Sequence, residues 1–315
     1  MNIVFLGSAQ FAVPSLKLLL STEHKISCVV TQPDRQKGRG LSVASTAVKT
    51  VALEEGLQIY QPEDINAAQA ITLLKKLNPE LFVVIAYGQI LSEELLDIPK
   101  IVAINLHASI LPKYRGAAPI NRAIINGESA TGVTVIKMTR QMDAGPIILQ
   151  KEIDISSDDT SVTLEEKLSD IGAHLLLQAI KLIESGKYDL MPQDEEGVIF
   201  APKLKKEDGL IKWYKPAQDI YNLIRGCIGW PGTFTYYKAK LLKIYKARVI
   251  KLAGLSGEHL HGEIIKVSRE GIAVLTGKDG LLIEELQMEG KKMMQAEEFV
   301  AGYKTESGET LGDKK

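Results

Sequence analysis

Cysteine is scarce in this chain of 315 residues, since Cys28 and Cys227 are the only two. Two cysteines so far apart exclude a disulfide-stapled scaffold, and they exclude a zinc or iron–sulfur site built from several thiolates. A low cysteine content of this kind is typical of a protein in a reducing cytosol.

Long apolar runs are also missing. The longest relevant stretches, 81–87 and 16–20, fall short of the ~18–20 residues that cross a bilayer. No Lys or Arg precedes Lys17, so the beginning of the chain lacks the basic region of a signal peptide. Hydrophobic residues make up 45% and charged residues 24%, as in ordinary globular proteins. We therefore expect a soluble, cytoplasmic protein with no membrane partner.

Several common catalytic and nucleotide-binding motifs are absent. The first glycine-containing loop, residues 7–12, lacks the glycines of G-x-G-x-x-G, which disfavours a dinucleotide site. The chain contains neither a P-loop motif nor the G-x-S-x-G of a hydrolase nucleophile elbow. The pair His259 and His261 lacks further metal-ligating partners, so we expect no metal.

The first part of the chain alternates between strands and helices. Apolar and β-branched runs predict strands at 2–6, 25–31, 58–60, 81–86, 101–106 and 131–138. Helical periodicity lies between most of them, and a long amphipathic helix is predicted at about 162–185, before Gly186. This alternation predicts an α/β fold with a Rossmann-like, open, mostly parallel sheet and helices on both faces.

The pattern changes after residue 187. Residues 188–208 are polar and contain two prolines and a cluster of charges, which is typical of a linker. A helix at about 216–226 is then followed by five short strands, predicted at 233–237, 241–249, 262–267, 272–276 and 281–286. Five short strands of this size favour a small β-barrel of the oligonucleotide-binding type (OB-like). We therefore predict domains at 1–187 and 209–315, joined by the linker 188–208.

The net charge of −1 hides a local excess of positive charge. Residues 201–258 contain twelve Lys and Arg against four Asp and Glu, a difference of +8. A basic face on a neutral chain is typical of a nucleic-acid interface. A solvated, lysine-rich surface would have the same composition, so composition alone leaves both interpretations open.

Three polar side chains follow or end strands of the predicted sheet. Alternation places Asn105 and His107 on one face of their strand, and Asp143 follows the next strand along the chain. Ligands of open α/β sheets bind outside the carboxyl ends of the strands, so we expect the three groups at the same edge. Each also has a structural explanation, as a loop cap or as a turn former before Gly145.

An amide, an imidazole and a carboxylate together suit acyl transfer without a covalent enzyme intermediate. The amide and a protonated imidazole can donate hydrogen bonds to a developing oxyanion. The carboxylate can orient the imidazole and help to move the proton that an attacking amine loses.

Residues 105–120, NLHASILPKYRGAAPI, resemble the signature of the 10-formyltetrahydrofolate-dependent formyltransferases. Asn105, His107 and Asp143 match the family's catalytic residues one by one. The resemblance implies that 1–187 is the folate-binding catalytic domain, with 10-formyltetrahydrofolate as formyl donor and no metal. It further implies that the folate is contacted by Ser109, Ile110, Leu111, Pro112, Tyr87, Gly88 and Arg140.

The arrangement of the whole chain resembles the members of this family that formylate the methionyl ester of initiator tRNA. Residues 31–35, 38–40 and 230–232 carry this part of the resemblance. It implies a protein that acts in translation initiation and whose second domain binds tRNA phosphates. No conspicuous exposed apolar seam argues for a dimer, so we expect a monomer. The basic residues expected to contact tRNA are Arg35, Lys37, Arg39, Lys203, Lys205 and Lys206.

Some positions depart from the family pattern. Gly7-Ser8-Ala9 replaces Gly-Thr-Pro, residues 45–49 read STAVK in place of PSPVK, and Ile228-Gly229 replaces Asn-Pro. Two alternatives remain: a related formyltransferase that acts on an amino sugar or a ribonucleotide amine, and a catalytically silent RNA-binding protein. The intact trio of Asn105, His107 and Asp143 argues against the silent protein.

Overall fold

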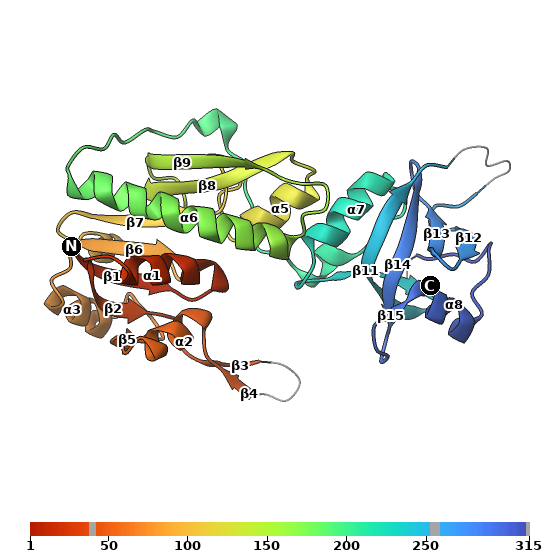
Figure 1. Cartoon of the computed structure of the whole chain (residues 1–315), viewed down its shortest axis with the longest axis horizontal. Coiled ribbons are helices and arrows are strands. Elements are labelled where there is room, and N and C mark those ends of the chain that lie inside the picture. Colours follow the sequence, from red (N-terminus) through yellow and green to blue (C-terminus); the bar gives the residue numbers. More distant parts are fainter. Residues whose placement is uncertain (38–41, 253–258, 313–315) are drawn as a thin grey trace. The chain divides into compact units, whose positions relative to one another are not determined.

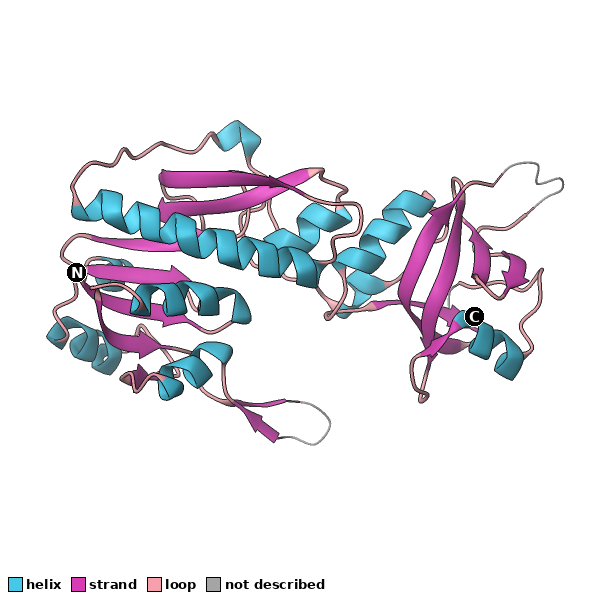
Figure 2. Cartoon of the chain, in the orientation of Figure 1, coloured by secondary structure: helices cyan, strands magenta, loops and turns pink. Residues whose placement is uncertain are grey.

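The computed structural model describes residues 1–37, 42–252 and 259–312 (Figures 1 and 2). The chain forms two compact units, which we describe separately. The first contains Met1–Pro119, Ala130–Asp154 and Glu165–Ala201, and the second contains Ile120–Ser129, Ile155–Leu164 and the chain from Pro202 onward. The predicted linker 188–208 contributes residues 188–201 to the first unit and 202–208 to the second. Within the described ranges, no helix combines the length and hydropathy of a membrane span.

A seven-stranded sheet forms the centre of the first unit, in the order β5-β2-β1-β6-β7-β8-β9. Its strands are β1 (Asn2–Gly7), β2 (Lys25–Val30), β5 (Ile59–Tyr60), β6 (Leu81–Ile85), β7 (Val102–His107), β8 (Ala130–Lys137) and β9 (Ile147–Asp154). The strands from β5 to β7 are parallel, whereas β8 and β9 are antiparallel to their neighbours. The predicted open, mostly parallel sheet is confirmed.

Helices cover both faces of this sheet, and β6 shows the consequence. All five residues of β6 are buried, as expected for a strand covered on both faces. On one face, α3 (Ala68–Lys76) and α4 (Glu93–Leu96) contribute Leu74 and Leu95 to a core with Leu6 and Phe82. Figure 1 shows α1 (Val13–Leu20) and α6 (Ser161–Glu184) along the other face. A Cβ atom at Gly172 of α6 would lie 2.9 Å from the Leu106 side chain, so this helix packs closely on β7.

Smaller elements complete this part of the chain. They are η1 (Gln10–Ala12), α2 (Ala47–Glu54) and η2 (Glu195–Gly197), together with β3 (Arg35–Lys37) and β4 (Ser42–Ala44). The helix α5 (Pro119–Ile125) belongs to the second unit from Ile120 onward. β3 and β4 form an antiparallel pair, which the sequence analysis does not predict. β9 and α4 are further elements that the sequence analysis does not predict.

The second unit contains an antiparallel sheet with the strand order β10-β11-β14-β13-β12, and β15 pairs with β14. Its elements are η3 (Lys206–Gly209), α7 (Ala217–Gly226), β10 (Thr233–Tyr237), β11 (Lys240–Ile250), β12 (Ile264–Ser268), β13 (Gly271–Leu275), β14 (Gly280–Met288), β15 (Met294–Gln295) and α8 (Ala296–Tyr303). Residues 310–312 bridge to Glu263 and Tyr236 at the two edges of the sheet. This last segment links the edges, as expected of a small barrel.

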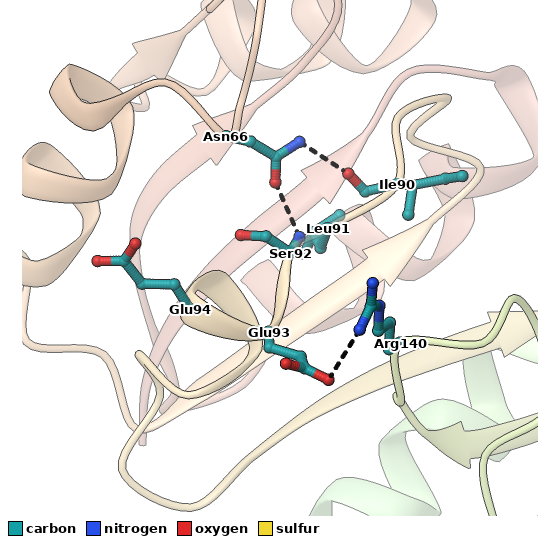
Figure 3. A pocket seen from close by; sticks show the side chains of 7 residues that line it. All are labelled: Asn66, Ile90, Leu91, Ser92, Glu93, Glu94 and Arg140. Atoms are coloured by element: carbon teal, nitrogen blue, oxygen red, sulfur yellow. Dashed lines mark hydrogen bonds and ion pairs between the residues drawn. The ribbon is translucent and has the colours of Figure 1, made fainter.

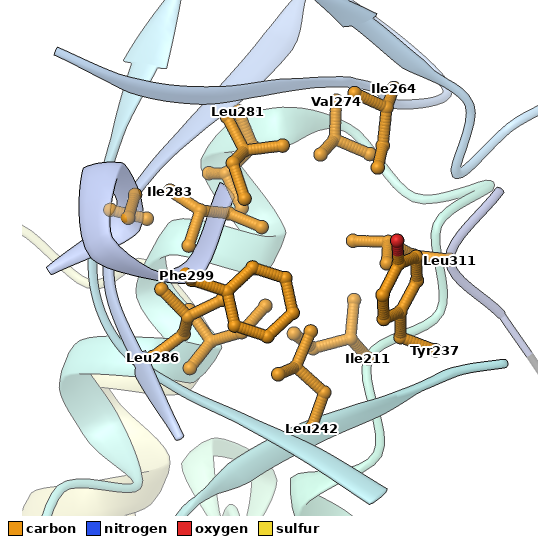
Figure 4. Packing of buried hydrophobic residues seen from close by; sticks show 14 of the residues in the cluster. Ile211, Tyr237, Leu242, Ile264, Val274, Leu281, Ile283, Leu286, Phe299 and Leu311 are labelled. Carbon is orange, nitrogen blue, oxygen red and sulfur yellow. The ribbon is translucent and has the colours of Figure 1, made fainter. Parts of the chain in front are cut away.

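The core of the second unit is built from the inner face of this sheet and its two helices. Figure 4 shows Phe299 of α8 pointing into the core with Leu242 and Leu286. The Phe299 ring lies 5.6 Å from the Tyr237 ring, measured between centroids. Ile220 and Ile224 of α7 belong to the same core. Although α8 is absent from the sequence-based prediction, it fills the centre of this unit.

Candidate active site

Asn105 and His107 share one face of β7, as alternation predicts. Ile104 and Leu106 are buried on the opposite face, where Leu106 approaches Gly172 of α6. His107 is the last residue of β7 and is 7% exposed. The end of this strand therefore presents an imidazole and an amide side by side.

The His107 ring lies between two acceptors. Its Nε2 atom is 2.9 Å from the Tyr114 carbonyl oxygen, and its Nδ1 atom is 3.6 Å from Oδ2 of Asp143. A carbonyl oxygen can only accept, so Nε2 carries a proton and donates it to Tyr114. The distance from Nδ1 to Oδ2 of Asp143 exceeds hydrogen-bond length, so the carboxylate lies beside the ring without occupying Nδ1.

Asp143 reaches His107 by a different route from the predicted one. Because β8 runs antiparallel to β7, the loop after β8 begins beside Ala103, to whose carbonyl the Met138 amide donates at 2.8 Å. The expectation that this loop starts at the carboxyl edge of the sheet is wrong. The loop instead returns to the His107 side chain, where Oδ2 of Asp143 also accepts the Gly116 amide at 2.8 Å.

The Asn105 side chain makes no hydrogen bond in the described part of the chain, and its buried Oδ1 atom has no partner. A buried polar atom without a partner costs about 1–3 kcal/mol. Such an atom calls for an explanation beyond stability. The amide is therefore available for a ligand.

The loop after β7 is held by two neighbouring strands. Thr134 of β8 donates its hydroxyl to the Ser109 carbonyl at 2.6 Å and accepts the Leu111 amide at 3.2 Å. Gln150 of β9 donates to the Leu111 carbonyl at 2.7 Å. The Ser109 hydroxyl bonds to the Lys113 carbonyl at 2.6 Å. The sequence analysis missed Thr134 and Gln150, because nothing local marks them as partners of a loop more than twenty residues away.

Two departures from the family pattern contribute to a hydrogen-bond network near the ends of β1, β2 and β6. The Ser8 hydroxyl donates to the Tyr87 carbonyl at 3.0 Å and accepts the Gln32 amide at 3.1 Å. The hydroxyls of Thr31 and Thr46 are 2.6 Å apart. At both positions the family residue, Thr or Ser, also carries a hydroxyl, so these two substitutions keep the groups that connect the loops.

Arg140, one of the residues expected at the folate, lines a pocket of about 470 Å³ in the first unit (Figure 3). The pocket is lined by Asn66, Ile90, Leu91, Ser92, Glu93, Glu94 and Arg140. The guanidinium of Arg140 is 3.9 Å from the Glu93 carboxylate, and the side chain is largely exposed. Tyr87 and Gly88 do not line this pocket. Tyr87 is buried, its hydroxyl has no hydrogen-bond partner among the residues that the structure describes, and burial raises the pKa of that hydroxyl.

The residues expected to contact tRNA are divided between the two units. Arg35 is exposed at the start of β3, Lys37 ends β3, and Arg39 lies outside the described residues. Lys203, Lys205 and Lys206 are exposed at and before η3 in the second unit.

The excess of +8 over residues 201–258 overstates the free positive charge of the second unit. Acids beyond this stretch pair with Lys238, Lys246, Arg248 and Lys251; their partners are Glu309, Glu284, Glu270 and Asp279. Arg225 is 7% exposed and donates to the Asp159 carbonyl at 2.8 Å. Within the described part of this stretch, Lys203, Lys205 and Lys206 near η3 have no acidic partner. The same holds for Lys212, Lys215, Lys240 and Lys243.

Metal-ligating side chains do not gather in the described part of the chain, where no group of three or more His, Cys, Asp or Glu is placed to hold an ion. His259 lies 3.0 Å from the Glu263 carboxylate, in an ordinary side-chain pair.

Comparison with known proteins identifies this chain as a formyl transferase. The family described as "Formyl transferase" matches residues 1–180, and "Formyl transferase, C-terminal domain" matches residues 203–304. Methionyl-tRNA formyltransferase from Moorella thermoacetica is 44% identical over 312 residues, which cover 99% of both chains. The enzyme of that name from Thermodesulfovibrio yellowstonii is 48% identical over 308 residues, covering 98% of this chain and 97% of the other. The chain belongs to the methionyl-tRNA formyltransferases.

Solved structures show the same fold at lower identity. The sugar 3N-formyl transferase WlaRD has a TM-score of 0.67 and 20% identity, covering 93% of this chain and 99% of its own. HypX from Aquifex aeolicus, solved with tetrahydrofolic acid, has a TM-score of 0.63 and 15% identity, covering 98% of this chain and 48% of its own. At these identities the likeness concerns the fold alone.

Proposed function

We propose that the protein transfers the formyl group of 10-formyltetrahydrofolate to the α-amine of methionyl initiator tRNA, which yields N-formylmethionyl-tRNA for translation initiation. The observation that carries the proposal is the placement of His107 between the Tyr114 carbonyl and the Asp143 carboxylate, with an unengaged Asn105 on the same face. Full-length relatives of the same activity support it.

Asn105 and His107 supply the hydrogen bonds that the reaction needs most. When the amine adds to the formyl carbon, negative charge develops on the formyl oxygen. The Asn105 amide and the Nδ1–H of a protonated His107 are the donors for this charge, and they are fixed before the reaction begins. Each such donor is worth about 10²–10³ in kcat.

Asp143 orients His107 and assists the proton transfer. A C–N bond forms to the α-amine, the bond to N10 of the folate breaks, and the proton lost by the amine ends on the leaving nitrogen. A carboxylate beside the imidazole stabilises its protonated form and provides a temporary acceptor for that proton. The mechanism needs no enzyme nucleophile; both cysteines, for example, are fully buried.

The folate is assigned to the loop 109–112 and to Tyr87, Gly88 and Arg140. The bonds from Thr134 and Gln150 keep that loop in a defined shape. The pocket beside Arg140 supports a binding surface for the pterin end of the folate. These assignments follow the family motif residue by residue.

The tRNA is assigned to Lys203, Lys205 and Lys206 of the second unit and to Arg35, Lys37 and Arg39 of the first. Exposed lysines bind phosphates as point charges. We further propose that the protein acts as a monomer in the cytoplasm, where charged initiator tRNA is made.

A formyl-transfer assay with matched acceptors tests this function. The protein is incubated with 10-formyltetrahydrofolate and either methionyl initiator tRNA, methionyl elongator tRNA, an amino-sugar nucleotide or a ribonucleotide amine. We expect efficient transfer to the initiator tRNA alone, at a rate that falls at least about 10²-fold in the His107→Ala variant. Preferred transfer to a sugar or ribonucleotide amine would establish the alternative member of the family. Equal formylation of both tRNAs would refute initiator specificity.

A further inference from the structure

The first unit ends in a strap, residues 191–201, that runs beside both loops of the active site. Met191 exchanges backbone hydrogen bonds with Ile147, directly after the Asp143 loop. At its other end, the Ile199 carbonyl accepts the Arg115 amide at 2.9 Å, and the Ala201 amide donates to the Arg115 carbonyl at 2.7 Å. The strap therefore joins the loop containing Asp143 to the loop containing Tyr114.

Gln193, in the middle of the strap, contacts the Asp143 backbone directly. Its Nε2 atom donates to the Asp143 carbonyl at 2.8 Å and to the Gly145 carbonyl at 2.7 Å. Its Oε1 atom accepts from Nε of Arg115 at 2.9 Å. Three hydrogen bonds thus use the whole side-chain amide, and two of them fix the peptide groups that follow Asp143 and Gly145.

Arg115 holds this amide in place from the other side. Its side chain is 5% exposed, and its two terminal nitrogens bind the Glu195 carboxylate at 3.2 and 2.9 Å. Those hydrogen bonds hold the pKa of the Glu195 carboxyl below its ordinary value. Because a guanidinium donates in fixed directions, it can orient Gln193 while remaining bound to Glu195.

The Asp143 backbone needs such support. Its φ angle is +54°, in the left-handed region that few residues other than glycine adopt. Conformations of this kind persist when the surrounding structure determines them, and they occur often at functional sites. The carboxylate must also reach Gly116 and His107 at the same time.

We propose that Gln193 is a positioning residue that, oriented by Arg115, fixes the Asp143 backbone so that the carboxylate faces His107. The inference deepens the proposed function and rests on the role given there to Asp143. Gln193 does not touch the reacting atoms. It sets the direction of the carboxylate, and small errors of placement at a reacting centre reduce the rate of catalysis strongly.

The test compares Gln193→Leu with the matched control Glu195→Ala. The first variant removes all three side-chain hydrogen bonds of Gln193, whereas the second removes the exposed partner of Arg115 and leaves Gln193 intact. Gln193→Glu is a second test variant, because it still accepts from Arg115 but loses both donors to the backbone carbonyls. Each is measured for kcat, for the KM of the folate and for hydrogen exchange of the Gly116 amide, whose partner is the Asp143 carboxylate.

We expect kcat to fall about 10- to 100-fold in both Gln193 variants, with the KM of the folate nearly unchanged and the Gly116 amide exchanging about tenfold faster. The kcat of Glu195→Ala should stay within about twofold of that of the unmodified protein, because the hydrogen bond from Arg115 Nε to Gln193 remains. Unchanged exchange and unchanged kcat in the Gln193 variants would overturn the inference. An equal loss of kcat in Glu195→Ala would also overturn the inference. The strap would then only hold the two loops together, without a specific role for Gln193.

Failure of the proposed function would look different. If Gln193→Leu accelerates exchange at Gly116 but Asp143→Asn retains normal turnover, Gln193 positions Asp143 while Asp143 has no catalytic role. If Asp143→Asn abolishes turnover and the Gln193 variants behave normally, the catalytic assignment stands and the positioning inference falls.

Discussion

Replacement of Asn105 should change the rate of catalysis without changing the stability of the fold, because the Asn105 side chain makes no hydrogen bond within the described ranges. Asn105→Ala should lower kcat about 10²–10³-fold, the cost of one oxyanion donor, with little change in thermal stability. Steady-state kinetics with methionyl initiator tRNA and thermal unfolding measure the two effects. Near-normal turnover would exclude Asn105 from the oxyanion site.

Asp143→Asn tests the charge of the carboxylate at constant shape. Asparagine tolerates a left-handed backbone as well as aspartate does, and its side-chain oxygen can still accept the Gly116 amide. The neutral side chain cannot stabilise a protonated His107 or receive a proton. We expect kcat to fall at least 10²-fold while folate binding, measured by calorimetry, is retained. A loss of folate affinity without a loss of kcat would assign Asp143 to binding.

The two cysteines are expected to be chemically silent in the folded protein. Burial raises the pKa of the Cys28 thiol to about 11 and that of Cys227 to about 12. A raised pKa keeps the thiol protonated at pH 8, and the thiolate is the reactive form. Iodoacetamide at pH 8 should therefore label neither residue until denaturant is added, as followed by mass spectrometry. Rapid labelling of the native protein would show that these regions open readily.

Among the elements of the fold, β8 controls the shape of the loop proposed to bind the folate. Thr134→Val keeps the side-chain volume but leaves the Ser109 carbonyl and the Leu111 amide without their partner. Unsatisfied buried groups cost about 1–3 kcal/mol each, so the KM of the folate should rise about tenfold with a smaller change in kcat.

Thr131→Val is the matched control for that variant. Thr131 is also buried on β8, but within the described ranges its hydroxyl makes no hydrogen bond to the loop 109–112. This control should leave the KM of the folate unchanged. Equal effects of the two substitutions would mean that any change in β8 disturbs the sheet.

The order of the elements was largely predictable because their signals are local. The apolar run 81–85 and the alternation at residues 104–107 specify buried strands and the facing of Asn105 and His107. The direction of β8 has no such signal, so the route of Asp143 to His107 was predicted wrongly. The role of Gln193 was missed because it also has no local signal. The sequence around Gln193 is polar and resembles a linker, although its side chain binds the Asp143 backbone. The helix α8 was missed because its short apolar pattern becomes meaningful only when Phe299 meets the barrel core.

At the scale of the whole molecule, charge is distributed so that the net value of −1 conceals a local basic surface. Lysines and arginines of the β11 strand and its neighbours are largely paired with acids. Exposed ion pairs of this kind contribute little to stability, and they reduce the charge available to an anionic partner. Positive charge remains available on Lys203, Lys205 and Lys206, which follow one another closely in the chain.

Simultaneous replacement of Lys203, Lys205 and Lys206 by alanine should weaken tRNA binding without affecting the folate. Each phosphate neutralised releases counterions, so the slope of log affinity against log salt should become shallower by about two to three. Fluorescence anisotropy of labelled initiator tRNA between low and physiological salt measures the slope. The matched control replaces Lys238, Lys246 and Lys251, whose charges are already paired, and should change it far less. If the control variant lost as much affinity as the test variant, the tRNA would contact the barrel strands instead, and an unchanged slope in both would show that these lysines only solvate the surface.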